Sequence, residues 1–103
     1  MSIITDIAFR IARTEAFIGW FDALRDRKGQ TIIARRIERV AGGNPGDVKS
    51  LGGGLHELRI AFGPGYRVYF TYEGDNLVVL LTGGDKASQK RDIAAARDMI
   101  EDD

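Results

Sequence analysis

The chain of 103 residues contains no cysteine, two prolines and one histidine, and it has no long apolar run. The lack of cysteine excludes disulfides and thiolate metal sites and fits a reducing cytosol. No segment approaches the roughly 20 apolar residues that a membrane helix needs. Residues 1–14 also lack the charged-then-apolar order of a signal peptide. We therefore expect a cytoplasmic protein without a membrane partner.

An excess of charge of either sign is also missing, because 15 basic residues balance 15 acidic ones. A globally basic chain would have favoured nucleic acid as a partner. Only residues 25–49 form a locally basic sector, with seven basic and three acidic residues. His, Cys and carboxylate residues nowhere show the spacing of a metal site, so we expect neither a metal nor another cofactor.

Residues 55–86, LHELRIAFGPGYRVYFTYEGDNLVVLLTGGDK, organise the rest of the chain. Apolar residues alternate with other residues along three runs, which predicts strands over 57–62, 66–72 and 77–82. Gly63-Pro64-Gly65 and the segment 73–76 supply the residues that tight turns favour. The pattern therefore predicts an antiparallel meander of three strands.

The alternation assigns side chains to two faces of this meander. The predicted apolar face carries Leu58, Ile60, Phe62, Val68, Phe70, Val79 and Leu81, and the other carries Glu57, Arg59, Ala61, Arg67, Tyr69, Thr71, Leu80 and Thr82. We expect Arg59 opposite Tyr69, with Arg67 as a diagonal neighbour. Cross-strand and diagonal neighbours lie within about 5.5 and 8 Å, so these three side chains could touch one ligand. Since Arg67 would point away from the core, we expect Arg67→Ala to leave the fold nearly intact.

The remaining segments complete an α+β pattern. A first strand is predicted over 5–12, followed by a helix over 15–27 capped by Thr14 and a helix from the possible cap Thr31 to Gly42-Gly43. Residues 42–54 are predicted as a loop with a short extended piece at 48–51. After the meander, a break at Gly83-Gly84 precedes a helix over 87–100. The order β-α-α-β-β-β-α predicts one domain over 1–103. An antiparallel sheet of about four strands would carry the N-terminal helix pair on its apolar face, with a C-terminal helix following the sheet.

Two blocks of sequence carry a resemblance to a known family. They are GNPGDVKSLGGGLHELRIAFGPGYRVYF and LLTGGDKASQKRDIAAA, in which the ELR, GPGYRVYF and GGDK-xxQ-xxDI segments occur in order. The resemblance covers nearly the whole chain, including the Trp20–Leu24 helix. The sequence resembles the HigB-type "addiction module killer protein" branch of the RelE/ParE toxin superfamily.

This resemblance implies the toxin of a type II toxin–antitoxin pair. Active relatives enter the ribosomal A site and cut mRNA, which inhibits translation and arrests growth. A separate antitoxin, usually a helix-turn-helix protein in this branch, neutralises the toxin. The implied partners are thus an antitoxin, the ribosome and mRNA.

The resemblance also implies roles for individual residues. The arginine of the YRV segment falls on Arg67, the basic residue of the preceding strand on Arg59, and the basic residue after the last strand on Lys86. Relatives place phosphate-contacting and catalytic groups at these positions. In a metal-free endoribonuclease, the RNA 2′-hydroxyl would attack its own phosphate while Arg67 and Arg59 stabilise the developing charge. Lys86 or Tyr69 would assist proton transfer.

Structural explanations remain open for each of these groups. Arg59 and Arg67 could lie on a solvated face beside Glu57, Lys86 could simply begin a helix, and Tyr69 could stack on a base or pack against Leu80. His56 is predicted as a packed residue rather than an acid or base.

The basic residues Arg35, Arg36, Arg39 and Lys49 could bind ribosomal RNA or an acidic antitoxin, or form a solvated face. Because the chain is neutral and has no Tyr or His after Tyr72, two alternatives to a nuclease also stay open. One is a ParE-like inhibitor that binds DNA gyrase, and the other is a toxin fold without activity.

Overall fold

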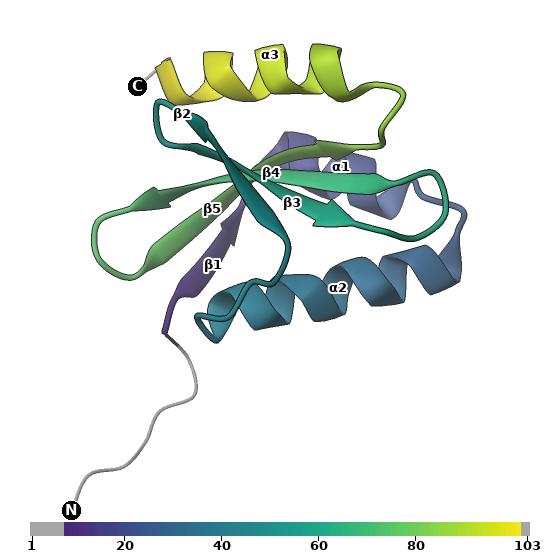
Figure 1. Ribbon diagram of the computed structural model, residues 1–103, viewed down its shortest axis with the longest axis horizontal. Helices are drawn as coiled ribbons and strands as arrows, with labels where there is room; N and C mark the ends of the chain where they lie inside the picture. Colours follow the sequence, from purple (N-terminus) through teal and green to yellow (C-terminus); the bar gives the residue numbers. More distant parts are fainter. Residues whose placement is uncertain (1–7, 102–103) are drawn as a thin grey trace, which may run out of the picture.

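The computed structural model describes residues 8–101 and confirms an α+β fold. A five-stranded sheet with the order β1-β5-β4-β3-β2 has helices on both faces (Figure 1). The elements in chain order are β1 (Arg10–Arg13), α1 (Glu15–Asp22), α2 (Arg27–Ala41), β2 (Val48–Gly52), β3 (Leu55–Ile60), β4 (Tyr66–Glu73), β5 (Leu77–Gly84) and α3 (Gln89–Glu101). Within residues 8–101, no helix is long and apolar enough to cross a bilayer.

The sheet has one strand more than the sequence predicted. The extended piece at 48–51 is the strand β2, which pairs antiparallel with β3 and forms one edge of the sheet. At the end of β2, Arg97 of α3 donates hydrogen bonds from Nη2 and Nη1 to Leu51 O at 2.7 Å and Gly52 O at 3.1 Å. The observed order is therefore β-α-α-β-β-β-β-α.

Strand β1 forms the other edge and pairs parallel with β5. The predicted first strand, 5–12, was placed too early: the observed strand begins at Arg10, and residues 5–7 lie outside the described residues. The connection is long enough for parallel pairing, because the chain passes through α1, α2 and three further strands before β5 returns beside β1.

The predicted meander is confirmed, but its first hairpin has a different register. Arg59 lies opposite Arg67, and Ile60 lies opposite Tyr66. Phe62 belongs to the turn, where Gly65 N donates to Phe62 O at 3.0 Å. Gly63 and Gly65 both adopt positive φ angles, 57° and 80°, which glycine permits in this longer turn.

The faces predicted for β5 were exchanged. The second hairpin closes with Glu73 opposite Leu77, whereas the sequence suggested Tyr72 opposite Leu77. A shift of one residue moves every side chain of a strand to the other face. Leu80 therefore joins Phe70 in the core under the N-terminal helices, and Leu81 faces α3.

Two apolar layers hold the domain together, one on each face of the sheet. The larger lies under α1 and α2 and includes Phe17, Ile33, Ile37, Val40, Leu58, Ile60, Tyr66, Val68, Phe70, Val78 and Leu80. The smaller lies under α3 and includes Leu55, Tyr69, Leu81 and Ala96. The face that carries Glu57 and Tyr69 is thus covered by α3 (Figure 1), and it is not an open surface.

The helix boundaries also differ from the expectation. Thr14 caps α1 by accepting a hydrogen bond from Phe17 N, as predicted, but α1 ends at Asp22. Asp26 is the cap of α2 and accepts from Gly29 N at 2.8 Å. Thr31 lies inside α2, where its hydroxyl donates to Arg27 O. A carboxylate is as good a cap as a threonine hydroxyl, and it allows the helix to begin one turn earlier.

The glycine pair before α3 continues the last strand and does not break it. Gly83 and Gly84 are the final residues of β5. A Cβ at Gly83 would overlap the Trp20 ring, and one at Gly84 would overlap the Asp92 carboxylate. Close packing of α1 and α3 on the end of β5 explains these two glycines.

Candidate functional site

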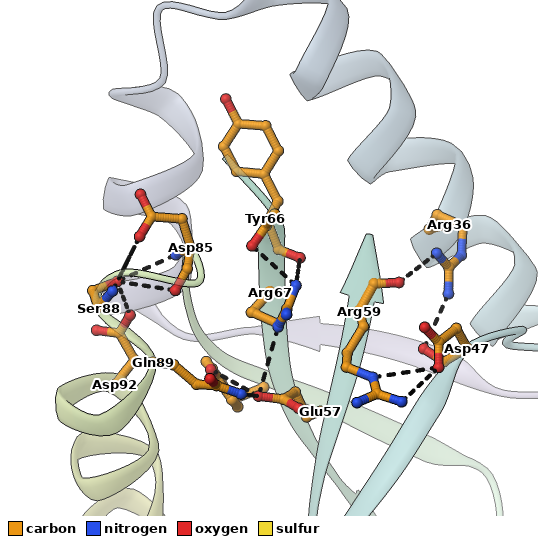
Figure 2. Close-up of polar contacts among 12 residues, drawn as sticks. Arg36, Asp47, Glu57, Arg59, Tyr66, Arg67, Asp85, Ser88, Gln89 and Asp92 are labelled. Atoms are coloured by element: carbon orange, nitrogen blue, oxygen red, sulfur yellow. Dashed lines mark hydrogen bonds and ion pairs between the residues drawn. The ribbon is translucent and has the colours of Figure 1, made fainter. Parts of the chain in front are cut away.

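Arg67 points from β4 toward the side of the sheet that carries α3, and its side chain is only 12% exposed. Its Nη1 donates hydrogen bonds to Gly65 O at 3.0 Å and Tyr66 O at 3.3 Å. Its Nε lies 3.8 Å from Glu57 Oε2. The guanidinium is therefore held along two edges, by backbone carbonyls on one side and by a carboxylate on the other (Figure 2).

Glu57 was expected only as a partner of Arg59 and Arg67 on a solvated face, but it is fully buried on β3. Its Oε2 accepts hydrogen bonds from Tyr69 Oη at 3.1 Å and from Gln89 Nε2 at 2.7 Å. Among the described residues, neither Glu57 Oε1 nor Arg67 Nε has a hydrogen-bond partner. Strands β3 and β4 and helix α3 thus meet in one polar cluster of Glu57, Arg67, Tyr69 and Gln89. Figure 2 shows Arg67 and Gln89 on either side of Glu57.

Lys86 lies between β5 and α3, close to the glycine turn that precedes Arg67. Its backbone N donates to Pro64 O at 3.4 Å. A Cβ at Gly65 would lie 3.4 Å from both Arg67 Nη1 and Lys86 Cβ. The Lys86 side chain is exposed, so the structure brings Lys86 and Arg67 together on either side of Gly65.

Arg59 is the cross-strand neighbour of Arg67, but its side chain binds elsewhere. Its Nη2 and Nε lie 3.1 and 3.3 Å from Asp47 Oδ1. The two side chains are 39% and 58% exposed, and solvent-exposed pairs of this kind contribute at most about 1 kcal/mol. The expected pairing of Arg59 with Tyr69 was wrong, because the register places Glu57 opposite Tyr69.

Tyr69 is buried beneath α3, so it has no exposed face on which a base could stack. Burial, and then the negative charge of Glu57, raise the pKa of Tyr69 above its ordinary value. His56 packs between aromatic rings, 5.3 Å from Phe70 and 5.1 Å from Tyr72 between ring centroids. Burial lowers the pKa of His56, consistent with its predicted packing role.

Of the four basic residues proposed for RNA binding, three are exposed and one is half-buried. Arg35 and Arg39 are exposed on α2, whereas Lys49 is exposed on β2, opposite Glu57. Arg36 is half-buried and holds the loop after α2, because its Nη1 donates to Arg59 O at 2.7 Å and its Nη2 to Pro45 O at 3.0 Å. Burial lowers the pKa of Arg36, with a smaller contribution from Arg39.

A second polar cluster fixes the start of α3. Asp85 Oδ1 accepts a hydrogen bond from Ser88 N at 3.1 Å, and the Ser88 hydroxyl donates to Asp92. Asp92 is buried against Gly84. The GGDK-xxQ-xxDI segment therefore combines groups that anchor the helix with Lys86 and Gln89.

Within residues 8–101, no three His, Cys, Asp or Glu side chains are grouped to hold a metal ion.

Comparison with known proteins places this arrangement in a family. Residues 19–101 match the family described as "Phage derived protein Gp49-like (DUF891)". A protein of Haemophilus influenzae (strain ATCC 51907 / DSM 11121 / KW20 / Rd), described as "Uncharacterized protein", is 42% identical over 91 residues, which cover 88% of this chain and 92% of the relative. The chain therefore belongs to the Gp49-like family of phage-derived proteins, a family associated with the toxins of toxin–antitoxin pairs.

Proposed function

We propose that the protein is the toxin of a type II toxin–antitoxin pair, of the HigB-like branch, and that it cleaves mRNA on the ribosome. The observation that carries this proposal is the position of Arg67, whose guanidinium is held by two backbone carbonyls and Glu57 with Lys86 next to it. A fixed guanidinium on β4 and an exposed lysine after β5, on either side of Gly65, form an arrangement that suits a phosphate.

The chemistry draws on the chain, the RNA and water. The 2′-hydroxyl gives up its proton to water and attacks the adjacent phosphorus. The bond to the 5′-oxygen of the next nucleotide breaks, leaving a 2′,3′-cyclic phosphate and a 5′-oxygen that takes up a proton to become a free hydroxyl. Arg67 stabilises the charge that develops on the phosphoryl oxygens. Lys86, being exposed, is the candidate for protonating the leaving oxygen. Orientation of the mRNA by the ribosome would supply the remaining part of the rate.

Two of the other residues predicted for the site, Tyr69 and Arg59, do not contact the phosphate in their observed positions. Tyr69 is buried and acts by holding Glu57. Arg59 would have to leave Asp47 to reach a phosphate, which an exposed pair can do at small cost. Arg35 and Arg39 remain candidates for contacts with ribosomal RNA, as does Lys49 on the other side of the sheet.

The test compares substitutions of Arg67 in a ribosome-dependent mRNA cleavage assay and in a growth assay. We expect Arg67→Lys to keep the fold and to lower the cleavage rate about a hundredfold, because an ammonium cannot replace the bidentate guanidinium. Arg67→Ala should abolish toxicity but also destabilise the protein, since it leaves the buried Glu57 without its cation. The earlier expectation of an intact fold for Arg67→Ala does not fit a side chain that is 12% exposed.

Arg25→Lys, an exposed substitution of the same kind, is the matched control and should cleave as the wild type does. If a folded Arg67→Lys variant is fully toxic, Arg67 is not the catalytic arginine. If the wild type arrests growth while mRNA stays intact and plasmid supercoiling changes, the nuclease proposal is wrong and gyrase is the target.

A further inference from the structure

We infer that Glu57 is the positioning residue of the site, orienting Arg67 directly and Lys86 through Gln89. This inference rests on the proposed function of Arg67 and Lys86. It adds a residue that the alternating pattern had placed on the surface and that the structure places in the interior.

The burial of Glu57 calls for a role other than stability. Moving a carboxylate out of water costs several kcal/mol, and an apolar residue of similar volume would often serve a core equally well or better. The layer under α3 on the same face of the sheet is otherwise built from apolar residues, among them Leu55, Leu81 and Ala96. A carboxylate at this position is therefore explained by the donors around it.

Two hydrogen bonds and one ion pair, from residues of β4 and α3, converge on one oxygen of Glu57. Tyr69 Oη on β4 and Gln89 Nε2 on α3 donate hydrogen bonds of 3.1 and 2.7 Å. Arg67 Nε lies 3.8 Å away, which is an ion-pair distance. Tyr69 and Gln89 thereby fix the Glu57 carboxylate. The fixed carboxylate in turn limits the rotation of the Arg67 guanidinium about the axis of the Arg67 side chain.

The same carboxylate also fixes the chain segment that carries Lys86. Gln89 is the first residue of α3, and its backbone N donates to Lys86 O at 3.4 Å. The Lys86 backbone N in turn donates to Pro64 O in the glycine turn. The contact between Gln89 and Glu57 therefore anchors the first turn of α3 where Lys86 meets the turn beside Arg67.

The key variant is Glu57→Gln, which keeps the shape of the side chain and removes its charge. We expect the half-saturating ribosome concentration to stay unchanged, while the single-turnover cleavage rate at saturating ribosomes falls about ten- to a hundredfold, as for groups displaced by about 1 Å. A merely structural role would lower the melting temperature and leave the rate of the folded protein unchanged. Glu73→Gln, exposed at the end of β4, is the matched control.

A second measurement is independent of catalysis. The Nε–Hε resonance of Arg67 in an NMR spectrum reports its environment, and we expect it to shift and to exchange faster with water in Glu57→Gln. If this resonance and the rate both match the wild type, the inference is overturned. If the wild type does not cleave mRNA, the proposed function fails, and the resonance still decides whether Glu57 holds Arg67.

Gln89→Ala keeps the test decisive if Glu57→Gln does not fold, because Gln89 is half-buried and its loss removes one hydrogen bond. The expected result is a lower cleavage rate at an unchanged half-saturating concentration. A wild-type rate in folded Gln89→Ala would show that the contact with Glu57 does not position Lys86.

Discussion

Lys86 is exposed and contributes no side chain to either apolar layer, so its function can be tested without disturbing the fold. We expect Lys86→Ala to change the unfolding free energy by no more than about 0.5 kcal/mol. Loss of a proton donor should lower the mRNA cleavage rate about a hundredfold or more. Lys90→Ala, another exposed lysine one helical turn later, should leave both quantities unchanged. A fully active Lys86→Ala variant would remove Lys86 from the proposed mechanism.

Individual residues of the site could be predicted where a local pattern was enough. Alternation placed Arg59 and Arg67 on the same face, which the structure confirms, although the two residues lie directly opposite each other and not diagonally as expected. The role of Glu57 could not be read from the same pattern, because it depends on the register of β3 and β4 and on Gln89, which lies 32 residues further along the chain. The GGDK-xxQ-xxDI spacing was the available signal, since it singled out Gln89.

Helix α2 begins at a cap that joins it to β4. Asp26 accepts a hydrogen bond from Gly29 N and another, at 2.8 Å, from the hydroxyl of Tyr66. The Gly29 hydrogen bond, followed by that of Tyr66, lowers the pKa of Asp26 below its ordinary value. Since the folded state favours the ionised form, this stabilisation is complete above the unfolded pKa. It is lost as the pH falls from about 4 through the folded pKa.

We therefore expect the melting temperature of the wild type to fall more steeply as the pH drops below about 4, the ordinary aspartate pKa, than that of Asp26→Asn. Asparagine still caps the helix but does not titrate. Asp75→Asn, in the exposed turn between β4 and β5, controls for the loss of one carboxylate. Equal slopes in wild type and Asp26→Asn would mean that the cap does not contribute to acid sensitivity.

Elements were predictable from the sequence to the extent that their signals are local. The three strands of the meander and the helix over 87–100 were found because periodicity defines them. The start of α2 was missed because Asp26 and Thr31 are both acceptable caps, and contact with Tyr66 favours Asp26. The faces of β5 were missed because one residue of turn length, which the sequence does not define, decides them.

At the scale of the whole molecule, the zero net charge bears on how an antitoxin binds. Long-range attraction contributes little to binding a neutral partner, so we expect an interface with an apolar or β-strand component. The antitoxin complex should therefore remain intact in 1 M NaCl, where the screening length is about 3 Å. Size-exclusion chromatography of the co-expressed complex at low and high salt measures this. Full dissociation at moderate salt would show that the interface is mainly electrostatic.

The hydrogen bonds from Arg97 to Leu51 and Gly52 have a consequence for the protein in concentrated solution. An unprotected outer strand is a template on which another polypeptide can align, and sheets that grow in this way give insoluble fibres. On β2, the carbonyl oxygens of the last two residues already accept hydrogen bonds from a guanidinium of the same chain. This end of the strand is therefore less available to a second polypeptide, without the proline or shortened strand that proteins also use for this purpose.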